Sequence, residues 1–304
     1  MTATTVGFIG LGIMGAPMAA HLVAAGYDVV GHNRSQAAVD RLVAAGGRAA
    51  ADIADAVRDA DVVITMLPDS PDVEAVVLGD DGVFAHAKPG TLHIDASTIR
   101  PDTAARIAEI GAAQGIRVLD APVSGGEQGA KDGILSIMVG GAAADVEAAR
   151  PVLETFGRTV VHVGPAGSGQ TVKAANQLIV AGTIELVAEA IVFLEAFGVD
   201  TEAAVRVLAG GLAGNAILER KAPGMLARSF QPGFRIDLHH KDMGIVLAAA
   251  REAGVVLPVG AVLGQLMAAA RAQGDGGLDH SALLRGVERL AGRSHQEPRN
   301  QEQE

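Results

Sequence analysis

A single lysine in a long apolar stretch is the residue of this sequence best suited to proton transfer. Lys173 lies three residues before Asn176, so in a helix the two side chains project from one face. Burial there would lower the pKa of the lysine towards neutrality, which suits a group that donates and accepts protons. The alternative is a lysine at a helix end that keeps its charge in water.

A serine followed by two glycines offers groups that could hold a small anion. In Asp120-Ala-Pro-Val-Ser-Gly-Gly-Glu127, Ser124 supplies a hydroxyl, and Gly125 and Gly126 supply backbone N–H groups that no side chain shields. The segment predicts a cradle for a small carboxylate, with a plain turn as the equal alternative.

A glycine pattern near the start of the chain is typical of dinucleotide binding. The glycines follow a short apolar run and open a helical pattern. Gly10 would allow a tight turn, and Gly12 would allow phosphates to approach the backbone closely. Gly15 would allow the helix to pack closely against the strand. The alternative is a glycine-rich turn that binds nothing. The predicted nucleotide site comprises Gly10, Leu11, Gly12, Ile13, Met14 and Gly15.

The end of the second expected strand bears on the choice between NADP and NAD. An acidic residue there would bind the ribose 2′-OH of NAD, but Asp28 lies too early, at the start of this strand. Asn33, Arg34 and Ser35 follow the strand instead, and the arginine fork and serine hydroxyl suit a 2′-phosphate. We therefore expect NADP (NADPH) to be preferred, with NAD as the alternative cofactor. The alternative for the segment itself is a solvated turn that contacts no cofactor.

Two further strand ends are expected beside the cofactor. Met66, Leu67 and Pro68 end one core strand and would lie over the adenosine side. The segment Asp95-Ala-Ser-Thr98 ends another strand and would lie near the nicotinamide. Each segment alone is also an ordinary connection from a strand to a helix.

The elements that position these residues change character about halfway along the chain. Short apolar runs first alternate with helical patterns, which is typical of a doubly wound, mostly parallel sheet. Only helical patterns follow, beginning with a long apolar helix that would link the two domains. We expect an α/β Rossmann domain over residues 1–164, an all-helical domain for substrate and oligomerisation over 165–293, and a loose polar tail over 294–304.

Composition excludes several classes of function. The 304 residues carry a net charge of −11, whereas nucleic acids and anionic membranes need basic patches on a protein partner. The chain has no cysteine, which excludes thiolate metal sites, and we expect no metal. Residues 2–27 contain no Asp, Glu, Lys or Arg, but the glycine motif and Pro17 interrupt this run. We therefore expect neither a signal peptide nor a membrane span, and a cytoplasmic location.

Taken in order, these segments resemble the β-hydroxyacid dehydrogenase family over about residues 5–292. The resemblance rests on the glycine motif of residues 7–15, Asp120 to Gly126, Gly167-Ser-Gly169 with Lys173-Ala-Ala-Asn176, and Lys241-Asp242. It implies that Lys173 is the catalytic acid and that Asn176 assists it. It implies substrate contacts from Ser124, Gly125, Gly126 and Asn176, and further cofactor contacts from Thr98, Phe234 and Lys241.

Within the family, Asn176-Gln177 and Asp279-His-Ser-Ala-Leu283 resemble the branch of tartronate semialdehyde (2-hydroxy-3-oxopropionate) reductases. The implied reaction reduces this small aldehyde acid to D-glycerate. The alternatives are 3-hydroxyisobutyrate or succinic semialdehyde dehydrogenases and a non-catalytic NADP-binding protein. Asn215 replaces a serine of this branch, which would change the substrate if the position lines the pocket. The apolar long helix also predicts a homodimer or homotetramer.

Replacing Arg34 by alanine should weaken the binding of NADPH by about ten-fold or more, because a charge-assisted hydrogen bond to the 2′-phosphate is lost. The binding of NADH should change little, since NADH lacks this phosphate. Dissociation constants for the two cofactors measure the difference, and equal losses would refute the 2′-phosphate role.

Overall fold

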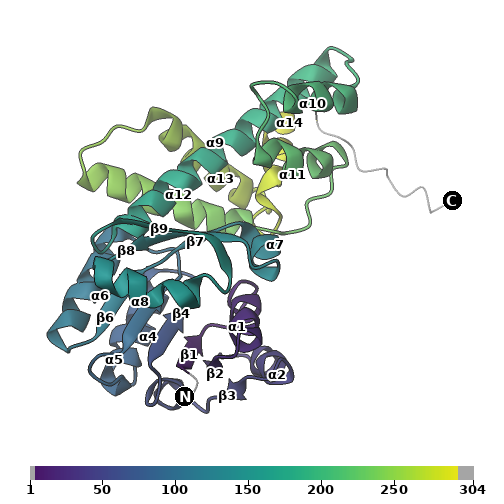
Figure 1. Ribbon diagram of the computed structural model, residues 1–304. Helices are drawn as coiled ribbons and strands as arrows, with labels where there is room; N and C mark the ends of the chain where they lie inside the picture. Colours follow the sequence, from purple (N-terminus) through teal and green to yellow (C-terminus); the bar gives the residue numbers. More distant parts are fainter. Residues whose placement is uncertain (1–3, 294–304) are drawn as a thin grey trace. The chain divides into compact units, whose positions relative to one another are not determined.

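The computed structural model describes residues 4–293, so the expected polar tail over 294–304 lies outside the described residues. The chain divides into two compact units, residues 1–175 and residues 176–304. This division falls inside a long helix, whereas the sequence places the domain boundary at residue 164. The first unit contains a sheet with helices, and the second contains helices (Figure 1).

The first unit is built on one sheet of nine strands within the described residues. The strands are β1 Thr5–Ile9, β2 Asp28–His32, β3 Arg48–Ala49, β4 Val62–Thr65, β5 Leu92–Asp95, β6 Arg117–Asp120, β7 Val123–Ser124, β8 Leu135–Gly140 and β9 Gly157–Gly164. Their order is β3-β2-β1-β4-β5-β6-β8-β7, with β9 paired to β8. Neighbours from β3 to β6 are parallel, whereas β8 runs antiparallel to β6 and β7. The order through β6 is that of a doubly wound nucleotide-binding fold, which confirms the predicted α/β class.

Alternate residues of the central strands pack into two separate cores, one on each face of the sheet. The helices of this unit are α1 Gly15–Ala24, α2 Gln36–Ala44, α3 Ile53–Val57, α4 Ser70–Leu78, α5 Val83–His86, α6 Pro101–Ala113, α7 Gly126–Lys131 and α8 Ala143–Leu153. In β4, Val62 and Ile64 join the core formed with α1, α2 and α8, while Val63 joins the core formed with α3 to α6. Burial on both faces explains why the strand is a continuous apolar run.

The structure contains four short elements that the sequence patterns do not predict: β3, β7, α5 and α7. None is longer than six residues. A segment of this length is too short to show a hydrophobic period, so local patterns could not reveal it.

The second unit consists of helices joined by partly buried ion pairs. Its helices are the latter part of α9 Ser168–Ala196, followed by α10 Thr201–Ala209, α11 Ala216–Leu226, α12 Ile236–Glu252, α13 Pro258–Ala272, the short 3₁₀ helix η1 His280–Ala282 and α14 Leu283–Leu290. Arg228, just after α11, donates hydrogen bonds of 2.8 and 2.9 Å to Glu195 of α9. It also donates bonds of 2.6 and 2.9 Å to Glu288 of α14. One guanidinium group therefore joins three helices.

Helix α9 is unusually long and apolar. It has 29 residues, and its most apolar 18-residue window has a mean hydropathy of 1.9, so by length and composition alone it could cross a membrane. Core helices pass the same test, and 44% of its most apolar window is buried within the protein. Gln177 and Glu185 are among its buried side chains, and burial, together with the charge of Glu189, raises the pKa of Glu185 to about 7.

The connection from β1 to α1 requires glycine at two of its three motif positions. Gly10 has a φ of 101°, and a Cβ there would lie 2.2 Å from the main-chain oxygen of Met66. A Cβ on Gly15 would lie 1.9 Å from the main-chain oxygen of Gly10. At Gly12, by contrast, a Cβ would meet nothing within 4 Å. Packing of the protein therefore does not need glycine at position 12, which leaves open space for a ligand.

Alanine substitutions at Gly15 and Gly12 should have opposite consequences. Gly15→Ala should lower the free energy of unfolding by about 2 kcal/mol or more, because the added methyl forces two backbone segments apart. Gly12→Ala should leave this free energy nearly unchanged and should weaken dinucleotide binding. Chemical denaturation and cofactor titration measure the two effects. A Gly12→Ala protein as unstable as Gly15→Ala would show that this assignment of roles is wrong.

Candidate active site

A buried carboxylate determines where α9 begins. Asp120 ends β6 and is 3% exposed. Its Oδ1 accepts a hydrogen bond of 2.8 Å from the N–H of Gly167, and its Oδ2 accepts one of 2.9 Å from the N–H of Gln170. N–H groups at the start of a helix have no partner inside the helix, so Asp120 caps α9 from a distant part of the sequence. Burial raises the pKa of Asp120, and these N–H groups partly oppose that shift.

Gln170 extends this cap to the neighbouring strand. Its Nε2 donates a hydrogen bond of 2.8 Å to the main-chain oxygen of Ser97, and its Oε1 accepts one of 3.1 Å from the N–H of Ile99. The first turn of α9 is therefore attached to the loops after both β5 and β6. Sequence reasoning missed these contacts of Asp120 and Gln170, because neither leaves a local pattern.

Lys173 lies one turn further along α9 and is buried, with 7% of its surface exposed. Its Nζ donates a hydrogen bond of 2.8 Å to the main-chain oxygen of Val123, the residue before Ser124. This position differs from that of a solvated lysine at a helix end. It also brings the candidate proton donor next to the candidate anion cradle.

The cradle has the backbone geometry that only glycine adopts easily. Ser124 ends β7, and Gly125 and Gly126 follow with φ angles of 144° and 67°. A Cβ on Gly126 would meet nothing within 4 Å. The backbone here can therefore be approached closely by a small ligand, within hydrogen-bond reach of a hydroxyl and two N–H groups.

A second buried aspartate aligns the loops after β4 and β5. Asp95 Oδ1 accepts hydrogen bonds from Thr65 Oγ1 at 2.8 Å and from the N–H of Ser97 at 3.2 Å. Ser97 Oγ in turn accepts one of 2.8 Å from the N–H of Leu67. Burial raises the pKa of Asp95 to about 6. These bonds place the predicted cofactor residues Met66, Leu67, Pro68 and Thr98 at one edge of the sheet.

The predicted 2′-phosphate residues lie at the same edge, after β2. Asn33 accepts a hydrogen bond of 3.0 Å from the N–H of Leu11, so it is attached to the glycine loop. Arg34 and Ser35 are exposed. Asp28 is at the opposite end of β2 and forms an ion pair of 2.6 Å with Arg48, which lowers the pKa of Asp28. Asp28 is therefore not available to bind the ribose of a dinucleotide.

Within the C-terminal unit, Asn176 belongs to a row of polar side chains. Asn176 Nδ2 donates a hydrogen bond of 2.7 Å to Gln177 Oε1. Gln177 Nε2 donates one of 2.5 Å to Asp242 Oδ2. Lys241 Nζ forms an ion pair of 2.8 Å with the other oxygen of Asp242. Sequence reasoning missed the contact between Gln177 and Asp242.

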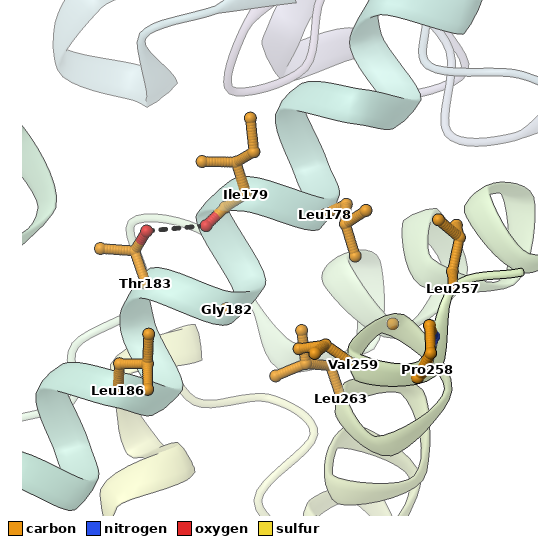
Figure 2. A pocket seen from close by; sticks show the side chains of 10 residues that line it. Leu178, Ile179, Gly182, Thr183, Leu186, Leu257, Pro258, Val259 and Leu263 are labelled. Atoms are coloured by element: carbon orange, nitrogen blue, oxygen red, sulfur yellow. Dashed lines mark hydrogen bonds between the residues drawn. The ribbon is translucent and has the colours of Figure 1, made fainter.

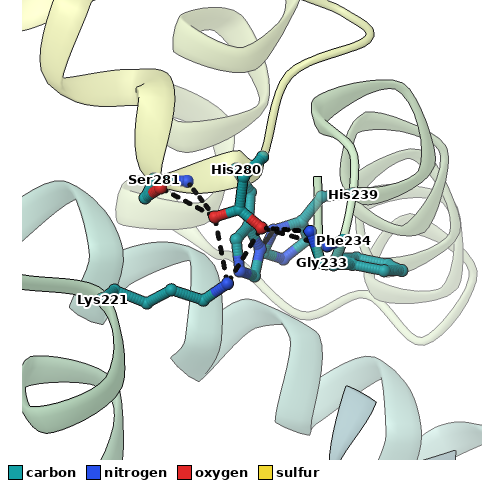
Figure 3. A network of polar contacts seen from close by, with 7 residues as sticks. Lys221, Gly233, Phe234, His239, His280 and Ser281 are labelled. Atoms are coloured by element: carbon teal, nitrogen blue, oxygen red, sulfur yellow. Dashed lines mark hydrogen bonds and ion pairs between the residues drawn. The ribbon is translucent and has the colours of Figure 1, made fainter. Parts of the chain in front are cut away.

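Phe234, another predicted cofactor residue, is supported by a second network in this unit (Figure 3). Its N–H donates a hydrogen bond of 3.0 Å to Asp279 Oδ2, and Lys221 Nζ donates to both oxygens of that carboxylate at 2.9 and 3.0 Å. The Phe234 ring meets the rings of His239 and His280 edge-on, at centroid distances of 5.5 and 5.4 Å. The loop that carries Phe234 is thus held by both its backbone and its ring.

Asn215 has a structural role that serine could also fill. Its Oδ1 accepts hydrogen bonds of 3.0 and 2.9 Å from the N–H groups of Ile217 and Leu218, so it caps α11. Serine and asparagine are both favoured at this helix position. The replacement is therefore compatible with the start of α11.

A pocket of about 320 Å³ between α9 and α13 does not resemble a catalytic site. Side chains such as Leu178, Leu186 and Leu263 line it, and none of its lining residues is titratable (Figure 2). Across residues 4–293, no group of three His, Asp or Glu side chains is placed to hold a metal ion.

Comparisons with known proteins match this chain in both of its units. Residues 5–164 match the profile of the NAD-binding domain of 6-phosphogluconate dehydrogenase, and residues 167–287 match the NAD-binding domain of NADP-dependent 3-hydroxyisobutyrate dehydrogenase. The 2-hydroxy-3-oxopropionate reductase of Escherichia coli is 41% identical over 94% of this chain and 97% of its own. The NAD-dependent L-serine dehydrogenase of Pseudomonas aeruginosa is 42% identical over 84% of this chain and 89% of its own.

A solved structure shows the same fold. The 3-hydroxyisobutyrate dehydrogenase of Mycobacterium tuberculosis, solved with L-serine, has a TM-score of 0.85 and 36% identity, covering 94% of this chain and 99% of that one. The matched profiles span both units, and the resemblance noted in the sequence is confirmed. The chain is thus an oxidoreductase that belongs to the NAD(P)-dependent β-hydroxyacid dehydrogenase family.

Proposed function

We propose that this protein is an NADPH-dependent reductase that converts tartronate semialdehyde to D-glycerate. The observation that carries the proposal is the buried ammonium group of Lys173, held beside Ser124, Gly125 and Gly126. The similarity to 2-hydroxy-3-oxopropionate reductase supports this substrate among those of the family.

Lys173 is the proton donor in this proposal. An ammonium group has three N–H donors, and the Val123 carbonyl takes one of them and holds Nζ in place. In the direction of reduction, Lys173 donates a hydrogen bond to the aldehyde oxygen and then its proton to the forming alkoxide. A bound nicotinamide dinucleotide supplies the hydride.

The carboxylate of the substrate is assigned to the serine–glycine cradle. The Ser124 hydroxyl and the N–H groups of Gly125 and Gly126 are donors, which suits a carboxylate rather than a cation. Holding the carboxylate there places the aldehyde of a three-carbon acid within reach of Lys173. Asn176 remains a predicted contact of the substrate.

The first unit has the features that a dinucleotide requires. Among residues 4–293, the space beside Gly12 is open and no side chain caps the N-terminus of α1, where a pyrophosphate would be favoured. The exposed Arg34 and Ser35, with Asp28 paired elsewhere, support NADP rather than NAD. One similar relative is NAD-dependent, so NAD remains the alternative. Ile13, Met14, Thr98, Phe234 and Lys241 remain predicted cofactor contacts.

We also propose that copies of this chain self-associate through α9. Ile179, Leu186, Phe193 and Phe197 are between 62% and 73% exposed. The first three are spaced by seven residues, as in helices that pair along one face. The apolar pocket beside Ile179 and Leu186 (Figure 2) could receive such a ridge from a second copy. A light-scattering mass equal to one chain would refute self-association.

The cytoplasmic location remains a prediction.

Lys173→Ala should reduce kcat by about 10² to 10⁴-fold, because a positioned proton donor contributes a factor of this size. NADPH binding should remain, since the glycine loop is untouched. Lys88→Ala is the matched control, because Lys88 is an exposed lysine paired with the exposed Asp59. NADPH absorbance gives kcat and fluorescence titration gives the dissociation constant; unchanged turnover would rule out the catalytic assignment.

Among small semialdehydes and 3-hydroxy acids, tartronate semialdehyde should give the highest kcat/KM. The comparison should include methylmalonate semialdehyde, succinic semialdehyde, 3-hydroxyisobutyrate and L-serine, each followed by the absorbance of the nicotinamide cofactor. A higher value for one of these would assign the enzyme to that substrate instead.

A further inference from the structure

We propose that Gln170 is a positioning residue that fixes the backbone of Thr98 relative to Lys173. The proposal rests on the proposed function, because it takes Lys173 to be the proton donor and Thr98 to be a contact of the cofactor. All three residues lie in the first unit, which ends at residue 175. The contacts that carry the proposal therefore belong to one compact body.

The side chain of Gln170 spans the loop after β5. Gln170 is buried, with 1% of its surface exposed. Its Nε2 donates a hydrogen bond of 2.8 Å to the main-chain oxygen of Ser97, and its Oε1 accepts one of 3.1 Å from the N–H of Ile99. These two partners lie on either side of Thr98 along the chain. Gln170 thus pairs with the backbone at this point as a neighbouring strand would.

The two bonds hold the two peptide groups that meet at Thr98. The carbonyl of Ser97 belongs to the peptide group before Thr98, and the N–H of Ile99 belongs to the peptide group after it. Each peptide group is planar, so the orientations of these two planes determine the φ and ψ angles of Thr98 and the direction of its Cβ. Ser97 and Ile99 are 0% and 1% exposed, whereas Thr98 is partly exposed. The residue whose backbone is fixed is therefore the one that a ligand can reach.

The same turn of α9 is attached to the neighbouring strand. The N–H of Gln170 donates a hydrogen bond of 2.9 Å to Asp120 Oδ2, at the end of β6. Lys173 follows on the same face of the helix, about 4.5 Å further along its axis, and its Nζ donates a hydrogen bond of 2.8 Å to the main-chain oxygen of Val123. Because β5 and β6 pair side by side, one helical segment sets the spacing between the loops that follow them.

Glutamine is the residue type that the two backbone groups require. A carbonyl needs a donor and an N–H needs an acceptor, and a side-chain amide supplies both. An asparagine would be one C–C bond, about 1.5 Å, shorter. An ionised glutamate has acceptors only, so it would face the Ser97 oxygen with a second acceptor. Replacing Gln170 would thus leave buried backbone groups without a partner, which weakens the hold on Thr98.

The spacing between Thr98 and Lys173 matters because hydride and proton reach one carbonyl group from different elements. In the proposed function, Thr98 contacts the cofactor that supplies the hydride, and Lys173 supplies the proton. A misplacement of about 1 Å can slow such a reaction by about 10²-fold. Gln170 joins the two elements directly, so its loss should slow the chemical step more than it weakens cofactor binding.

Gln170→Met should lower kcat by about ten-fold or more and change the dissociation constant of NADPH by less than about three-fold. Methionine is similar in length to glutamine but forms neither bond. The assay uses the substrate that the wild type reduces fastest. With NADPH deuterated at the transferred position, the primary isotope effect on kcat should rise, because hydride transfer becomes the slower step. A loss of stability alone would reduce the amount of folded protein and leave this isotope effect unchanged.

Thr91→Val is the matched control for Gln170→Met. Thr91 precedes β5 at its other end and is 4% exposed, and its Oγ1 donates a hydrogen bond of 3.3 Å to the main-chain oxygen of Ala60. This substitution also removes a buried side-chain donor from a main-chain oxygen. It should lower the melting temperature and keep the kcat and the isotope effect of the wild type.

Gln170→Glu allows the contact to be switched by pH in a single protein. A protonated carboxyl group has a donor and an acceptor, as the amide has, whereas the ionised group cannot donate to Ser97. Burial and the carboxylates of Asp95 and Asp120 should raise the pKa of this group, against the opposing charge of Lys173. The ratio of kcat for this variant to kcat for the wild type should therefore fall by about ten-fold or more between about pH 5 and 8.

The melting temperature of the protein without cofactor tests the contact independently of activity. A group whose pKa is raised in the folded state stabilises the protein at low pH, and this contribution is lost as the pH rises through that pKa. The melting temperature of Gln170→Glu relative to the wild type should therefore fall between about pH 5 and 8. For Gln170→Met, which adds no titratable group, this difference should stay constant.

Three results would overturn the proposal. One is a Gln170→Met protein that keeps the kcat and the isotope effect of the wild type. Another is a Gln170→Glu protein whose relative melting temperature falls with pH while its kcat ratio stays constant, because the contact would then be purely structural. The third is a Thr91→Val protein that loses as much kcat as Gln170→Met.

Failure of the proposed function would look different. A wild-type protein inactive on every substrate, or a Lys173→Ala protein with unchanged turnover, would overturn the proposed function and with it the role of Gln170. The pH dependence of the melting temperature of Gln170→Glu would remain in both cases, because it depends only on the contact with the loop after β5.

Discussion

The buried carboxylate of Asp120 is the interaction on which the geometry around Lys173 depends. A carboxylate removed from water costs free energy unless its oxygens accept hydrogen bonds. The N–H groups of Gly167 and Gln170 are its partners, and they are available only when α9 begins where it does. A Cβ on Gly169 would lie 2.4 Å from the main-chain oxygen of Met138 and 2.7 Å from that of Asp120. Glycine there allows the helix to approach the strand.

Carboxylates are used in two different ways in this chain. Asp120 determines the residue at which α9 starts. It thereby determines the position of Lys173 relative to the edge of the sheet. Asp242 determines the orientation of the Gln177 amide, because its carboxylate accepts a hydrogen bond from the NH₂ group of Gln177. Both effects need burial, since an exposed carboxylate could exchange its partners for water.

Much of the fold was predictable, because buried strands and amphipathic helices leave periodic patterns in the nearby sequence. The hydrogen bond from Lys173 to Val123 was not predictable, since every residue has a carbonyl group and Val123 is fifty positions away. The caps made by Asp120 and Gln170 are also long-range contacts. The bond from Asn176 to Gln177 joins neighbours, whereas the bond from Gln177 to Asp242 spans sixty-five positions. Asn215 could have been recognised as a helix cap from its residue type alone.

The fixed start of α9 has a consequence for how the sequence of this protein can evolve. An α-helix turns by about 100° for each residue, while Asp120 holds the residues at its beginning. One residue inserted between Gln170 and Lys173 would leave the cap intact and rotate the ammonium group away from the Val123 carbonyl. Side chains in this segment can therefore vary, but its length cannot. The spacing from cap to lysine therefore restricts insertions and deletions in this segment.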